Sequence, residues 1–158
     1  YRDGQCHPFS GRVILTGSRR KARETVLQAI YWALSSDDPV SQTLQTMALR
    51  TDLSPEASEY ALTVGKLMWA NREQLDEEIG KVAVNWDVSR ISRIDRILMW
   101  MALTEIRSVQ GVPAKVAIDE AIELAKRYSV EKAPAFINGI LDKLARKSLE
   151  EPRVAEDV

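Results

Sequence analysis

Residues 91–106 read ISRIDRILMWMALTEI, and this stretch decides the fold. Its centre, residues 97–103, is a run of seven apolar side chains. Apolar residues also recur at steps of three and four from Ile91 onward, which indicates a helix and not a buried strand. Ser92 and Asp95 form the S-x-x-D pattern of a capped helix start. Because a helix that is apolar on every face belongs in the middle of a core, we expect the other elements to pack around this one.

Length and composition point to one domain. The chain has 158 residues, enough to bury a single core, and its one cysteine, Cys6, excludes an internal disulfide. No apolar run reaches the ~18 residues of a membrane span, and the first residues lack the order of a signal peptide. We therefore expect a cytoplasmic protein that makes no membrane contact.

Charge is divided unevenly along a chain whose net charge is −1. Residues 1–23 hold six Lys or Arg and one Asp, a net charge of +5, which leaves −6 for residues 24–158. A basic end on a nearly neutral protein indicates an anionic partner at that end.

Residues 1–17 show no helical period and read as an N-terminal extension. They contain Cys6 beside His7, the only histidine. Two adjacent side chains with no other Cys or His in the chain complete no metal site and no catalytic triad. We predict no metal, no cofactor and no catalytic residue.

The following residues carry helical periods. Ser18 begins a helix that runs to about residue 34, and its first turns read SRRKAR. Cations at a helix start oppose the macrodipole, at a cost of roughly 0.3–1 kcal/mol each, but they suit a phosphate backbone. From spacing alone, a nucleic-acid contact and an ordinary solvated surface are about equally good interpretations.

Further helices are predicted by start signals at Pro39, Ser54-Pro55 and Asn71, the last with Gln74 in a capping box. Two more are expected over residues 117–128 and 133–147. Trp86 reads as a structural plug before the central helix. Gly139 is expected to permit close approach of a neighbouring helix. Asp119, Glu120 and Glu123 read as a solvated acidic face, since the first half of a helix favours acids.

No segment has the period of a strand, so the predicted fold is all-α, with about seven helices in two packed bundles. An N-terminal group of about three helices precedes a C-terminal group built round residues 91–106. We expect one helical domain over residues 18–148 and a polar tail over residues 149–158.

Four ordered blocks of the sequence resemble the NusB family of bacterial transcription antitermination factors. They are RRKARETVLQAIY at 19–31, the W-x-x-x-R-I-x-x-I-D-R-I-L pattern at 86–98, VPAKVAIDEAIELAKRY at 112–128 and AFINGILDKLA at 135–145. One departure is Met99, where relatives often have Arg.

The resemblance implies an all-helical, non-catalytic protein that binds boxA-type single-stranded RNA together with NusE, a small-subunit ribosomal protein. It further implies a role in the RNA polymerase antitermination complex on ribosomal RNA operons. Carried over by position, the expected RNA-binding residues are Arg19, Arg20, Lys21, Arg23 and Lys132. Tyr31 and Asp95 match family positions near the partner and RNA surface, and we expect a basic partner to dock on an acidic side near Asp95 and Glu105.

Two other classes of function remain open at this point. A homodimeric interaction module with secondary RNA affinity would use exposed residues among Met68, Trp69, Met99 and Trp100. A complete RNA-modifying enzyme is disfavoured, because residues 18–147 contain neither a cysteine nor a Gly-rich nucleotide loop.

Overall fold

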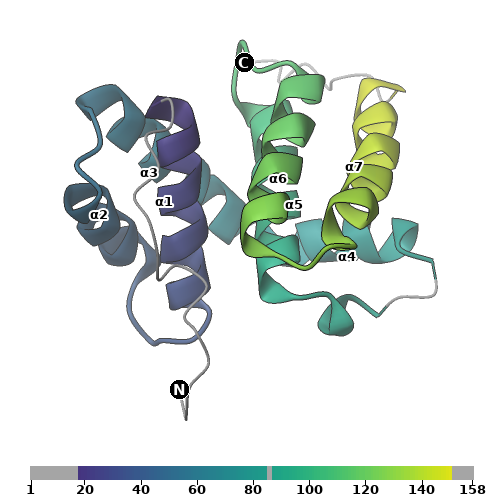
Figure 1. Cartoon of the computed structure of the whole chain (residues 1–158), viewed down its shortest axis with the longest axis horizontal. Helices are drawn as coiled ribbons and strands as arrows, with labels where there is room; N and C mark the ends of the chain where they lie inside the picture. The colour runs from purple at the N-terminus through teal and green to yellow at the C-terminus, as the bar shows by residue number, and fades with distance from the viewer. Residues whose placement is uncertain (1–17, 85–86, 151–158) are drawn as a thin grey trace, which may run out of the picture.

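A computed structural model describes residues 18–84 and 87–150 of the chain (Figure 1). In these ranges seven α-helices and one 3₁₀ turn follow one another, and there is no strand. The helices are α1 (Ser18–Ala33), α2 (Val40–Arg50), α3 (Pro55–Ala70), α4 (Arg72–Val82), α5 (Arg93–Ser108), α6 (Ala114–Tyr128) and α7 (Ala133–Glu150); the turn is η1 (Val88–Arg90). The prediction of an all-α fold is confirmed.

The helices form two bundles that lie side by side in Figure 1. Helices α1, α2 and α3 pack on one another, and α5 packs against α4, α6 and α7. Helix α5 also contacts α1 and α3, so it joins the two bundles. Both the two-bundle arrangement and the central place of α5 agree with the sequence prediction.

Helix α5 is buried without a break from Ile97 to Glu105. Its start is fixed locally, because the backbone N–H of Asp95 donates to Ser92 Oγ at 3.2 Å. The predicted cap is therefore present. Nine consecutive buried positions on one helix require neighbours on every side, and helices from both bundles supply them.

The N-terminal bundle contains one unusually close helix contact. It lies along α3, whose start is capped by Ser54, which accepts from Ala57 N at 3.2 Å, and has Pro55 in its first turn.

Gly65 makes the close contact farther along α3. A Cβ added to Gly65 would lie 2.7 Å from Leu44 of α2. Gly65 thus permits the close approach of α2 and α3.

The structure corrects two expectations about single residues. Among the described residues, no heavy atom from a neighbouring helix lies within 4 Å of a Cβ added to Gly139, so this glycine permits no close helix approach. The side-chain amide of Asn71 donates to Leu67 O at 2.9 Å at the end of α3 and does not cap α4. Residues 1–17 and 151–158 and the predicted plug Trp86 lie outside the described residues.

Candidate nucleic-acid interface

The first turns of α1 present cations around a hollow. Ala22, Val26 and Ile30 face the core, which leaves Arg19 exposed and Arg20 and Lys21 partly exposed. A hollow of about 440 Å³ lies beside them; we name it the cationic hollow, and it is lined by Ser18, Arg19, Arg20, Arg23 and Glu120. In the described part of the chain, α1 has no acidic residue in its first turn. Backbone N–H groups at a helix start and clustered cations both favour an anion there.

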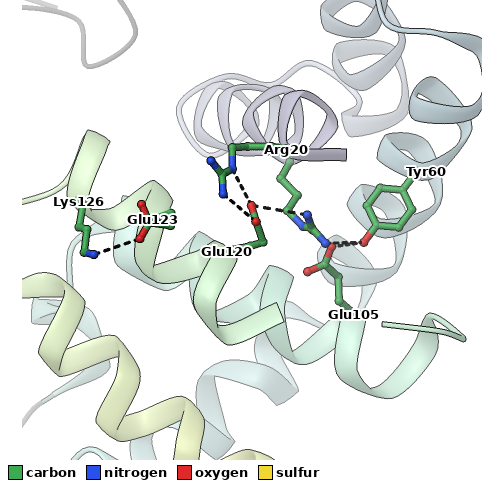
Figure 2. A network of polar contacts seen from close by, with 7 residues as sticks. Arg20, Tyr60, Glu105, Glu120, Glu123 and Lys126 are labelled. Carbon is green, nitrogen blue, oxygen red and sulfur yellow. Dashed lines mark hydrogen bonds and ion pairs between the residues drawn. The ribbon is translucent and has the colours of Figure 1, made fainter. Parts of the chain in front are cut away.

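Arg20 is held across the bundle junction by Glu120 of α6 (Figure 2). Its Nε and Nη2 atoms donate to the two carboxylate oxygens, each at 2.9 Å, while the arginine side chain stays 40% exposed. These hydrogen bonds hold the pKa of Glu120 below its usual range, against the opposing effect of burial. A guanidinium binds a carboxylate and a phosphate through the same fork, so Glu120 occupies the place that a phosphate would take on Arg20.

Arg23 is buried, with only 4% of its surface exposed. Its Nε donates to Glu105 Oε1 at 2.7 Å, and its Nη1 lies 3.7 Å from Glu120 Oε2. The hydroxyl of Tyr60 donates to the same oxygen of Glu105. Burial, followed by the Glu105 carboxylate, raises the pKa of Tyr60 well above its usual range, so this hydroxyl remains a donor.

This buried cluster gives Arg23 a structural place that the sequence does not predict. Arg23 joins α1 to α3 and α5 through Tyr60 and Glu105, and the phosphate contact expected of it stays a prediction. The interpretation of Glu120 as part of a solvated acidic face is wrong, because Glu120 bridges to Arg20. No local sequence pattern marks the contact that the Tyr60 hydroxyl makes with Glu105.

The remaining candidate residues lie at the opposite end of α1. Arg93 at the start of α5 donates to Ser35, just after α1, at 2.6 Å. Asp95 accepts from Ser129 Oγ at 2.6 Å, which brings the turn before α7, and with it the exposed Lys132, to the same end. Tyr31, half-buried in the last turn of α1, is twelve residues from Arg19, about 18 Å along the helix axis.

Asp95 and Glu105 do not form the exposed acidic side that the sequence predicts. Asp95 is 6% and Glu105 1% exposed, and each carboxylate accepts hydrogen bonds from inside the protein. Burial of an unpaired carboxylate is costly, which explains these internal donors. The role of Tyr31, Asp95 and Glu105 in partner binding stays a prediction, and any such role for the two acids would act through the residues they position.

Three of the four residues suggested for a homodimer interface are in the core. Met68, Met99 and Trp100 are each at most 1% exposed. Trp69 is half-buried, with the Arg72 guanidinium 4.0 Å over its ring. Met68, Met99 and Trp100 therefore provide no exposed apolar surface for a second copy of the chain, and of the four residues only Trp69 is partly exposed.

Two other features are absent from the described residues. Within residues 18–84 and 87–150, no three His, Cys, Asp or Glu side chains gather where a metal ion could bind. No helix in this part of the chain is both long enough and apolar enough to cross a membrane.

Fold and site together define a small two-bundle helical protein with a cationic edge at its first helix, and comparisons identify the family. A model described as the NusB family matches residues 20–146, and the chain belongs to this family. The transcription antitermination protein NusB of Salinibacter ruber is 40% identical over 126 residues, which cover 79% of each protein.

Two solved structures are similar to the whole helical domain. A NusB structure from T. maritima has a TM-score of 0.76 and 32% identity, and it covers 85% of this chain and 94% of that one. A crystal structure of the antitermination factors NusB and NusE in complex with dsRNA has a TM-score of 0.74 and 19% identity, covering 84% and 99%. The second likeness shows the fold alone.

Proposed function

We propose that this chain is a transcription antitermination factor that binds boxA-type single-stranded RNA together with NusE. In this role it supports processive transcription of ribosomal RNA operons in the cytoplasm, as part of the RNA polymerase antitermination complex. It acts by binding, without catalysing a reaction. The observation that carries the proposal is the cationic hollow at the start of α1, on a chain of the NusB family.

Phosphate contacts supply the electrostatic part of this binding. Arg19, Arg20 and Lys21 are accessible around the first turn of α1, and Lys132 is exposed at the other end of the domain. Arg23 is not counted in this set, because its guanidinium is buried against Glu105. Cations at both ends of α1 suit an extended strand, which reaches farther than a compact anion would.

NusE is proposed as a partner because a NusB of the same fold is crystallised with NusE and dsRNA. Four phosphate contacts alone leave RNA binding weak and tolerant of sequence. A second protein that touches the same strand raises the effective concentration of each contact surface, and the affinity rises by about 10²-fold or more. By linkage, RNA tightens the binding of NusE by the same factor.

The test is a titration of boxA-type RNA with the chain alone and with NusE added, over a range of salt concentrations. Four contacts give a slope of log affinity against log salt of roughly −3. The double variant Arg19→Ala and Arg20→Ala should bring the slope to about −1.5. A slope near zero in the wild-type protein, or equal RNA affinity with and without NusE, would overturn the proposal.

A further inference from the structure

A second hollow adjoins the cationic hollow and shares Ser18 and Arg19 with it. It has a volume of about 460 Å³ and lies between the first turns of α1 and α3 and the end of α5. We name it the Tyr60 hollow; its chemically distinctive lining residues are Arg19, Glu56, Glu59, Tyr60, Thr63 and Gln110. Arg19 thus lines both hollows; the cationic hollow adds two more guanidinium groups, and the Tyr60 hollow adds an aromatic ring and neutral or acidic polar groups.

The Tyr60 ring offers a fixed stacking surface in this hollow. Its hydroxyl is anchored on the buried Glu105 (Figure 2), and the Arg19 guanidinium lies 4.5 Å from the ring centre. Among the described residues Arg19 has no carboxylate partner, whereas Arg20 pairs with Glu120, and Arg23 pairs with both Glu105 and Glu120. Unpaired bases of RNA stack on tyrosine rings and on guanidinium planes, and this stacked pair presents both kinds of surface.

The polar residues of the Tyr60 hollow discriminate between parts of a nucleotide. Glu56 and Glu59 repel a phosphate, which keeps the RNA backbone on the side of the cationic hollow. Their carboxylates accept hydrogen bonds from exocyclic amino groups, which adenine, cytosine and guanine carry and uracil lacks. The Gln110 amide both donates and accepts, so it can pair with the remaining atoms of a base edge.

We propose that the Tyr60 hollow binds one amino-bearing base of the RNA, and that the phosphate of this nucleotide lies in the cationic hollow. The inference rests on the proposed function and deepens it, since it adds a base-reading site to a set of phosphate contacts. Phosphate contacts position an RNA strand without reading its sequence, whereas a base in this hollow contributes specificity.

The test fills the hollow and leaves the cations in place. Thr63 is exposed on α3, so Thr63→Trp puts an indole into the space of the base without disturbing the core. We expect RNA affinity to fall about 5- to 150-fold, the range for the loss of one stacked base, with an unchanged salt slope. Gln110→Trp fills the hollow from another wall and should act in the same way. The matched control is Thr46→Trp, the same substitution at an exposed position of α2 that lines neither hollow.

A scan of boxA-type RNA with single abasic nucleotides locates the base. For the wild-type protein one abasic position should lower affinity strongly, and uracil placed there should bind more weakly than cytosine. For Thr63→Trp the same abasic position should have no further effect.

Three outcomes separate failure of this site from failure of the proposed function. If Thr63→Trp and Gln110→Trp bind RNA like Thr46→Trp, the base site is wrong and the RNA function stands. If they lower affinity and the salt slope together, they disturb phosphate contacts and the base site is again wrong. If the wild-type protein with NusE binds no RNA, the proposed function fails, and the base site fails with it.

Discussion

Two helices of this protein begin with arginine-rich segments, SRRKAR at residues 18–23 and SRIDR at residues 92–96, and the fold surrounds the two segments differently. In the α5 segment Ser92 caps the helix and Asp95 stands in its first turn. Arg93 donates to Ser35, and Arg96 pairs with Asp76 while its guanidinium lies over the Trp100 ring. This helix start is completed by groups from the protein itself.

The α1 segment lacks an acidic residue in its first turn, and its partners come from distant helices. Arg23 is buried on Glu105, Arg20 is shared with Glu120, and Arg19 lies on the Tyr60 ring. The number of carboxylate partners thus falls from Arg23 through Arg20 to Arg19, toward the start of the helix. The comparison teaches that a cap, a first-turn acid and internal partners complete the α5 start, whereas the α1 start keeps Arg19 exposed with no carboxylate partner among the described residues.

The largest expected effect comes from Arg23→Ala, which leaves Glu105 buried without its cation. Breaking a buried ion pair costs about 3–5 kcal/mol of unfolding free energy, or about 6–20 °C in melting temperature for a chain of this size. Thermal and denaturant unfolding measure it. Arg19→Ala, in the same helix turn, should change stability by less than about 0.5 kcal/mol. Equal melting temperatures for the two variants would contradict the distinction between buried and exposed cations.

A smaller effect is expected at the α5 start, from Ser92→Ala. Loss of the cap removes the acceptor of the Asp95 N–H and costs about 1 kcal/mol. Ser89→Ala is the control, because Ser89 is exposed and, unlike Ser92, caps no α-helix. Its backbone N–H, which donates to Asp87 Oδ1 at 3.1 Å, is retained in the variant. Neither variant should alter RNA affinity. If Ser92→Ala weakened RNA binding as Arg19→Ala does, the two helix starts would not differ in function as the comparison states.

Glu120→Gln sharpens the comparison by removing the carboxylate that competes for Arg20. A partly exposed ion pair is worth about 0.2–1 kcal/mol, so RNA affinity should rise by up to about fivefold while stability falls by at most about 1 kcal/mol. Glu123→Gln is the matched control. It removes the same charge from the same helix, but the carboxylate that it removes pairs with Lys126 and not with Arg20. RNA affinity equal in both variants would show that overall charge, and not occupation of Arg20, sets the effect.

The same residue gives the smallest effect, a dependence of stability on pH. The hydrogen bonds from Arg20 lower the pKa of Glu120 in the folded protein. The ionised Glu120 therefore makes its full contribution to stability above the ordinary glutamate pKa of about 4.3, and this contribution is lost as pH falls through the lowered pKa. Burial raises the pKa of Glu24, which contributes with the opposite sign. We therefore expect the stability difference between wild type and Glu120→Gln, measured by denaturant unfolding, to shrink as pH falls below about 4. A constant difference would contradict this assignment.

Local patterns were sufficient to predict the helices and the central place of α5. The apolar run at residues 97–103, the Ser92 cap and the Ser54-Pro55 start signal depend on neighbours within a few residues, and the structure contains each of them. The residues that carry the candidate RNA site could be named only because four sequence blocks resembled a family.

Pairings between distant helices could not be predicted in the same way. The sequence predicts a solvated Glu120, because the helical pattern of residues 117–128 contains no information about Arg20, one hundred residues earlier. Arg23 did carry a signal, since it stands four residues before Leu27 and seven before Ile30, both buried. A cation on the core stripe of a helix indicates a buried partner, but only the fold identifies that partner as Glu105.

The Arg23–Glu105 contact also bears on the order of events during synthesis. The two residues are 82 positions apart, so a ribosome adding about 5–20 residues per second makes Glu105 roughly 4–16 s after Arg23. During this interval α1, α2 and α3 can associate, but the guanidinium that the finished fold buries must stay hydrated. The α5 side of the N-terminal bundle is therefore completed only when α5 arrives, and the two bundles are joined only after the helix that carries the apolar run 97–103 has been made.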